Sequence, residues 1–248
     1  MRQIQFRNAT KGKKKHPPVI SYGLTLDKIL AIYKYKGEKM AYFNLTEQLT
    51  DHMSSFIKKP KDVDAAVTRI KKAILSLEDR PYWVVGYGSI INKRSREKTF
   101  PDAMKTSACT VSGWQRVFDL SSSKGSYANV RENAEHSFNG IAVKVAGEDM
   151  IDFVLRESNY DLVDVKAVLA DNTEVDAKIV VAKVNKDAEQ PRLDYVQAIV
   201  NGMSGLSGKD GVMKFLENSY LADGVTTLKE WMENLDLAEY AAKYDSNY

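Results

Sequence analysis

Cysteine and histidine are scarce in this chain of 248 residues, and their scarcity excludes several kinds of site. Cys109 is the single cysteine, so neither an intrachain disulfide nor a multi-cysteine metal site is available. The three histidines, His16, His52 and His136, show neither metal-ligand spacing nor the signature of a Ser-His triad. We therefore expect a chain that uses no metal and no other cofactor.

Long hydrophobic runs are also missing. No apolar stretch approaches the roughly 18 residues that a membrane-spanning helix needs. The basic residues at 11–15 lead into His16-Pro17-Pro18, which is unlike the apolar core of a secretory signal. We expect a cytoplasmic protein without membrane contacts.

Charge is unevenly distributed along the chain. Residues 1–80 carry 17 Lys/Arg and 8 Asp/Glu, a net +9, whereas the whole chain has a net charge of only +3. This asymmetry indicates either a solvated basic segment or a surface that binds nucleic acid through residues 1–80, and we favour the solvated segment.

Apolar residues recur at spacings of three and four in six segments of the chain, and this recurrence predicts a helix in each. The strongest pattern covers residues 62–77, with Asp62 as its N-cap. Further helices are predicted at residues 44–57, 149–155, 193–201, 211–221 and 227–244, and a helical turn is expected from Asn92.

Residues rich in Val, Ile and aromatics predict strands at 82–87, 108–120, 140–145, 162–169 and 175–184. Strands come first and most helices follow, so we expect an α+β fold: a small mixed or antiparallel β-barrel flanked by helices, with an N-terminal helical extension. The predicted organisation is a basic tail at 1–23, the extension at 24–80, the barrel domain at 81–225 and a C-terminal helix at 226–248.

The loop Gly86-Tyr87-Gly88-Ser89 fits none of the common glycine motifs. A dinucleotide fingerprint needs a third glycine where Ile91 stands, and a hydrolase nucleophile elbow needs glycines where Tyr87 and Ile91 stand. The loop does expose backbone N–H groups, which bind anions or a developing oxyanion.

Five segments together resemble the γ-glutamylcyclotransferase-like family, across residues 83–222. They are residues 85–91 (VGYGSII), 113–118 (GWQRVF), 139–145 (NGIAVKV), 155–160 (LRESNY) and 195–202 (YVQAIVNG). Residues 92–96 (NKRSR) are closest to poorly characterised bacterial members and differ from the glutathione-degrading branch.

The resemblance implies an enzyme that releases 5-oxoproline from a γ-glutamyl amide by attack of the substrate's own α-amine. This reaction needs neither metal nor covalent intermediate. Glu157 matches the family's catalytic glutamate, and an apolar environment would raise its pKa toward that of a useful base.

The resemblance also implies the substrate-binding residues. Backbone N–H groups from Gly88 through Ser89 to Ile90 would hold the α-carboxylate or the oxyanion. Tyr87, Tyr160 and Tyr195 are expected to line the pocket.

Two alternatives stay open. The same scaffold could bind a small metabolite without turning it over, or bind nucleic acid through the N-terminal region. The sequence also does not distinguish the release of 5-oxoproline from a related amide reaction in the same pocket. The sequence gives neither the leaving group nor the oligomeric state.

Overall fold

The computed structural model describes residues 49–50, 53–54, 60–78, 80–122, 125–183 and 188–236. The chain divides into two compact units, residues 1–58 and 59–248. In the first unit the described residues, 49–50 and 53–54, are helical, as predicted for 44–57. The predicted tail at 1–23 and residues 24–48 of the predicted extension lie outside the described residues. The predicted domain boundaries remain predictions.

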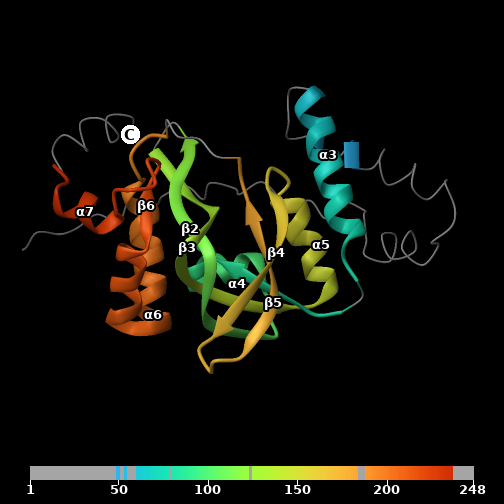
Figure 1. Cartoon of the computed structure of the whole chain (residues 1–248). Coiled ribbons are helices and arrows are strands. Elements are labelled where there is room, and N and C mark those ends of the chain that lie inside the picture. Colours follow the sequence, from blue (N-terminus) through green and yellow to red (C-terminus); the bar gives the residue numbers. More distant parts are fainter. Residues whose placement is uncertain are drawn as a thin grey trace, which may run out of the picture. The chain divides into compact units, whose positions relative to one another are not determined.

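A closed barrel of five strands forms the centre of the second unit (Figure 1). The strands follow one another around the barrel in the order β3-β1-β5-β4-β2, and β2 pairs with β3 to close it. The β1–β5 pairing is parallel, whereas the other pairings within the barrel are antiparallel. The short strand β6 extends the sheet beyond β2. Their bounds are β1 (Tyr82–Gly86), β2 (Lys105–Ser122), β3 (Gly125–Val145), β4 (Asp161–Leu169), β5 (Glu174–Val181) and β6 (Ser219–Leu221).

The long β2–β3 hairpin bends around the barrel at an irregularity. The register shifts between Ser112 and Trp114, and Gly113 between them has φ +81. Residues 133–136 of β3 lie opposite this one residue of β2, so the extra residues belong to β3. Extra residues in one strand bend a hairpin and increase its twist, and glycine adopts this positive φ without strain. The bulge therefore lets one hairpin contribute both to the barrel wall and to a projecting arm.

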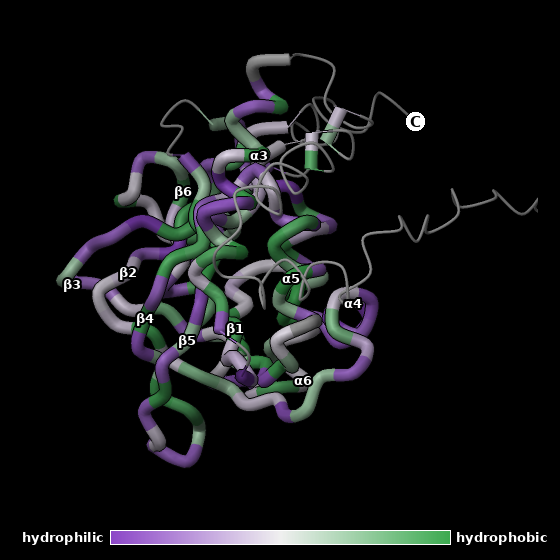
Figure 2. Tube along the Cα trace, turned by 90° about the vertical axis from the view of Figure 1, so that its right-hand side faces the viewer, coloured by the Kyte–Doolittle hydropathy of each residue, from purple (hydrophilic) through white to green (hydrophobic). Residues whose placement is uncertain are grey.

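Among the described residues between 60 and 236, six helical segments surround the strands: α3 (Pro60–Leu75), η1 (Ser89–Ile91), α4 (Lys93–Thr99), α5 (Gly147–Arg156), α6 (Leu193–Glu217) and α7 (Leu228–Glu233). Figure 1 shows α3 beside α5 on one side of the strands and α6 on the other. Helix α3 buries an apolar stripe that includes Val63, Val67, Ile70 and Ile74. In the tube coloured by hydropathy, β1 and α5 are largely hydrophobic (Figure 2). No helix among the described residues is long and apolar enough to cross a membrane.

The predicted fold class, an α+β barrel flanked by helices, is confirmed. The predicted strand at 140–145 is too short, because β3 begins at Gly125. The polar residues at 131–137 concealed this strand. Arg131, Glu132 and Ser137 pair with β2, and residues 133–136 lie at the register shift opposite Gly113.

Several predicted helix ends are also wrong. The helices predicted at 193–201 and 211–221 are the two helical segments of α6, which join at Gly208, whose φ of 63 and ψ of −159 are not helical; the first segment continues well beyond its predicted end. This helix ends at Glu217, because residues 219–221 pair with β2 as β6. Helix α7 ends at Glu233 instead of continuing toward 244, and residues from 237 on lie outside the described residues. Helix α3 begins at Pro60, so Asp62 lies in its first turn and is not the N-cap.

Candidate functional site

Glu157 stands directly after α5, as its C-cap residue. The helix forms because Met150, Phe153 and Val154 recur on one face and are buried against the barrel. Its last turn closes when the Glu157 N–H donates to the Phe153 carbonyl at 2.9 Å, and the Tyr160 N–H then donates to the Glu157 carbonyl, also at 2.9 Å. The burial of α5 and the two backbone hydrogen bonds at its end together fix the backbone position of Glu157.

The Glu157 carboxylate is mostly removed from water. Its side chain is 18% exposed, compared with 46% for its neighbour Arg156, whose Nε lies 3.3 Å from Glu157 Oε1. Burial raises the pKa of the Glu157 carboxyl above its ordinary value, and the Arg156 guanidinium opposes that shift. A carboxyl group with a raised pKa is a stronger base than an ordinary glutamate once it is ionised.

The Glu157 charge acts on two tyrosines. Burial raises the pKa of Tyr87 well above its ordinary value, with further contributions from Tyr160, Tyr195 and Glu157. Burial likewise raises the pKa of Tyr160, and the Glu157 charge adds to the shift. Tyr195 in turn contacts the residue after Tyr87, because its hydroxyl faces Gly88. The structure thus brings together residues that are up to 108 positions apart, as the numbers of Tyr87 and Tyr195 show.

The Tyr87 and Tyr195 hydroxyls are engaged with the protein backbone. Tyr87 donates to the Val180 carbonyl of β5 at 2.7 Å. Burial raises the pKa of Tyr195, while hydrogen bonds to its hydroxyl from the backbone of Ser89 and Ala128 oppose that rise. Both hydroxyl groups therefore position neighbouring backbone.

The loop after β1 turns immediately into the short helix η1. The Ile91 N–H donates to the Gly88 carbonyl and the Asn92 N–H to the Ser89 carbonyl, each at 3.0 Å. The Ile90 N–H takes part in neither of these bonds. Asn92 accepts from the Arg94 N–H and caps α4, which agrees with the predicted helical turn from Asn92.

Helix α6 holds this loop in place through two glycine contacts. A Cβ on Gly88 would lie 2.3 Å from the Tyr195 hydroxyl, so only glycine permits this approach. Two turns further along α6, a Cβ on Gly202 would lie 2.7 Å from the backbone of Ile91 and Asn92. The Asn92 side chain also donates to the Ala198 carbonyl at 3.1 Å. The loop conformation is therefore set by α6, more than 100 residues away in the chain.

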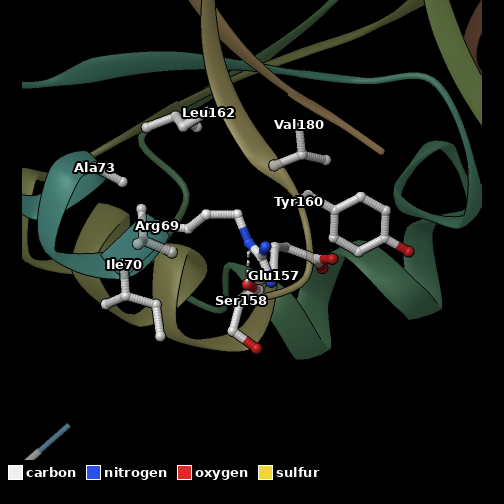
Figure 3. Close-up of a pocket in the computed structure, with 9 residues that line it drawn as sticks. Arg69, Ile70, Ala73, Glu157, Ser158, Tyr160, Leu162 and Val180 are labelled. Atoms are coloured by element: carbon white, nitrogen blue, oxygen red, sulfur yellow. Dashed lines mark hydrogen bonds between the residues drawn. The ribbon is translucent and has the colours of Figure 1, made fainter. Parts of the chain in front are cut away.

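A small pocket opens beside Glu157, on the side that faces α3 (Figure 3). Its enclosed volume is about 10 Å³, which accommodates about one water molecule. Arg69 of α3 contributes its side chain, and its Nε donates to the Ser158 carbonyl at 3.2 Å. The pocket is lined by Arg69, Ile70, Ala73, Val154, Glu157, Ser158, Tyr160, Leu162 and Val180.

Some of the predicted site residues line this pocket and others do not. Glu157 and Tyr160 line it, whereas Tyr87, Tyr195 and the loop from Gly88 to Ile90 do not. Sequence reasoning missed Arg69, because no pattern within α3 indicates which barrel residues it faces. Among the described residues, no group of three or more His, Cys, Asp and Glu side chains is arranged to hold a metal ion.

Comparison with known proteins gives results at the level of structure. No family model matches the sequence, and no curated protein matches it significantly. Among solved structures, a γ-glutamyl cyclotransferase is similar, with a TM-score of 0.50 and 15% identity over 54% of this chain and 86% of the other. An uncharacterized protein from Homo sapiens, loc79017, also gives a TM-score of 0.50, at 16% identity over 56% of this chain and 87% of the other.

A third similar structure is YkqA from Bacillus subtilis, with a TM-score of 0.50 and 17% identity over 67% of this chain and 59% of the other. These likenesses confirm the expected γ-glutamylcyclotransferase-like fold. At such identities they concern the fold alone.

Proposed function

We propose that the chain is a γ-glutamylcyclotransferase-type enzyme that releases 5-oxoproline from a γ-glutamyl amide. One observation carries this proposal: a mostly buried glutamate with a raised pKa, Glu157, lines a pocket together with Tyr160 in the fold of a solved γ-glutamyl cyclotransferase. Folds host many activities, so the proposal depends on the residues of the site as well as on the fold.

Glu157 acts as the base and then as the acid in this reaction. The substrate's α-amine is protonated at neutral pH, with an ordinary pKa of about 8, and cannot attack until it loses a proton. Glu157 accepts this proton, the α-nitrogen bonds to the γ-carbonyl carbon, and the amide C–N bond breaks. Glu157 then returns this proton to the leaving nitrogen. The new ring nitrogen gives up a second proton, which the departing amine takes up to leave as an ammonium, so the two protons lost by the α-nitrogen equal the two gained by the leaving nitrogen.

The loop after β1 binds the negative charge. Its backbone N–H groups between Gly88 and Ile90 receive the α-carboxylate or the oxygen of the tetrahedral intermediate. Tyr195 holds this loop from α6, because its hydroxyl accepts from the Ser89 backbone. Tyr160 lines the pocket beside Glu157, and burial of the Glu157 carboxyl maintains its raised pKa.

Mass spectrometry of 5-oxoproline tests the reaction on a panel of γ-glutamyl amides that includes glutathione. Glu157→Gln keeps the size of the side chain and removes the base, so we expect turnover to fall about 10²- to 10⁴-fold. Retained turnover in this variant would refute the role of Glu157.

Glu217→Gln is the matched control. Glu217 is also a glutamate at the end of a helix with a cationic partner, Lys229 at 3.1 Å, but it lies outside the pocket and is 48% exposed. We expect its turnover to equal that of the wild type.

A second candidate function is a protein that binds a small metabolite without turnover. The half-buried Arg69 guanidinium beside Glu157 favours this alternative, because it can bind an anionic metabolite without taking part in any chemistry. Thermal stabilisation of the wild type by a panel member, without 5-oxoproline formation, would identify it.

A further inference from the structure

A second hollow, of about 450 Å³, lies where α7 packs beside α6 (Figure 1). We call it the α6–α7 groove. Among the described residues its lining is mostly apolar, and Asp194 and Gln197 are the polar members. The apolar members are Leu193, Val196 and Val200 of the first segment of α6, Leu216 of the second segment and Met232 of α7.

The α6–α7 groove is separate from the proposed catalytic site. On one face of α6, Tyr195, Ala198 and Gly202 contact residues 88–92, the loop after β1. At 3.6 residues per turn, the groove residues 193, 196 and 200 lie on nearly the opposite face of the same helix. An occupant of the groove therefore leaves the substrate site open.

The apolar lining of the groove is only partly covered by the described residues. Met232 is 41% exposed, and Val200 and Leu216 are half-buried. A groove of this volume with an apolar floor and a few polar groups at its rim is typical of a binding surface.

The chain itself supplies a segment beside the groove. Residues 237–248 (LAEYAAKYDSNY) begin five positions after Met232, which lines it. This C-terminal segment lies outside the described part of the chain. Its sequence places Leu237, Tyr240 and Tyr244 at spacings of three and four, which is the pattern of an apolar stripe.

The length and the chemistry of the C-terminal segment both fit the groove. Its 12 residues would span about 18 Å as a helix and about 40 Å when extended, so the segment can reach the whole lining. A tyrosine ring fills apolar space while its hydroxyl pairs with polar groups at a rim. A segment joined to the groove wall by so few residues also has a local concentration in the millimolar range, which favours it over a separate partner.

We propose that the C-terminal segment, residues 237–248, binds in the α6–α7 groove of its own chain and covers the apolar lining. Leu237, Tyr240 and Tyr244 supply the side chains that fill the groove. This inference does not depend on the proposed catalytic function.

Cross-linking in the full-length protein tests where the segment binds. Gln197→Cys places a thiol at the exposed rim of the groove, and Lys243→Cys places one in the segment without removing an apolar side chain. A short bismaleimide should join these two thiols within one chain. Lys209→Cys is the matched control, because Lys209 is also exposed on α6 but lies outside the groove lining. It should cross-link to Lys243→Cys about tenfold more slowly, since a bound segment has a high local concentration only at the groove. Cys109 is buried and does not compete.

Thermal unfolding tests whether the segment covers Met232. Met232→Ser should lower Tm by about 3–8 °C, because a buried apolar side chain is lost. Met104→Ser is the control: Met104 is 59% exposed and outside the groove, so its Tm should change by about 2 °C at most. When Leu237, Tyr240 and Tyr244 are all replaced by serine, the segment no longer fills the groove. In that background Met232→Ser should lower Tm by about half as much or less.

Three results would overturn the inference. Equal rates of cross-linking at Gln197→Cys and Lys209→Cys would show that the segment is not held in the groove. Covalent dimers in place of internally linked monomers would show that the segment of a second copy occupies it. Additive losses of Tm in the combined variant would show that Met232 and the segment do not touch.

Discussion

Replacing Gly88 with alanine tests the contact that joins the loop to α6. The new methyl carbon would lie 2.3 Å from the Tyr195 hydroxyl oxygen, far closer than carbon and oxygen approach one another. The Tyr195 ring has little room to withdraw, because it packs edge-on against Tyr127 and Phe118, with centroids at 4.8 and 6.3 Å. Overpacking of this kind lowers the free energy of unfolding by about 1–3 kcal/mol.

The hydroxyl oxygen alone is responsible for the clash. Without it, the nearest Tyr195 atom to the new methyl would be Cζ at 3.6 Å, an ordinary van der Waals contact. Tyr195→Phe by itself removes the acceptor for backbone hydrogen bonds from Ser89 and Ala128, which destabilises the fold by about 1–3 kcal/mol. In that background, however, Gly88→Ala should lower the free energy of unfolding by less than about 0.5 kcal/mol.

Urea unfolding of the wild type, the two single variants and the double variant measures this coupling. Gly205→Ala serves as the control, because Gly205 lies in α6 and nothing is within 4 Å of its added methyl group. It should stabilise the protein by about 0.4–1 kcal/mol. If Gly88→Ala is equally destabilising with and without the Tyr195 hydroxyl, the reasoning about this contact is wrong.

Three other properties follow from buried polar groups. Folding raises the pKa of Glu157, so the stability of the wild type relative to Glu157→Gln should fall as the pH rises from the unfolded-state pKa, near 4.5, through the folded-state pKa, and should then stay constant. Urea unfolding of both proteins from pH 4 to 8 measures this difference in stability. A difference that does not change with pH would contradict the expectation. Arg131 pairs at 3.0 Å with the fully buried Asp119, so Arg131→Met should lower the free energy of unfolding by about 3–5 kcal/mol, whereas Asp119→Asn in the same chain should recover part of that loss. Burial raises the pKa of Cys109 to about 12, so a thiol reagent at pH 8 should label this cysteine only when the protein unfolds locally or globally. Fast labelling without denaturant would contradict this, because it would show that the folded protein exposes the thiol.

Local patterns predicted the helix and the strand that flank the proposed site, whereas Glu157 itself was identified by the resemblance. Residues 149–155 show helical periodicity, and the observed helix α5 ends directly before Glu157. The apolar run after Pro81 became β1, which leads into the loop at Gly88. Such signals succeed because each depends on contacts between near neighbours in the chain and on one buried face.

Other features needed the whole fold. Residues 219–221 continue a helical pattern, yet they form β6 because β2 offers them backbone partners. The polar arm of β3 carries little strand signal, and its pairing with β2 overrides that weakness. These are contacts with residues distant in sequence, which no local window contains.

The sequence alone determined the α+β composition, the helix that ends at Glu157 and the absence of cysteine and histidine clusters from the chain. Only the tertiary structure decided that Tyr195 contacts Gly88 and that the Val180 carbonyl accepts a hydrogen bond from the Tyr87 hydroxyl. It also decided that Arg69 lines the pocket beside Glu157. Periodicity states which face of an element is buried. Barrel closure and the packing of α3 and α6 select its neighbours, because burial of apolar faces depends on the shape of the entire unit.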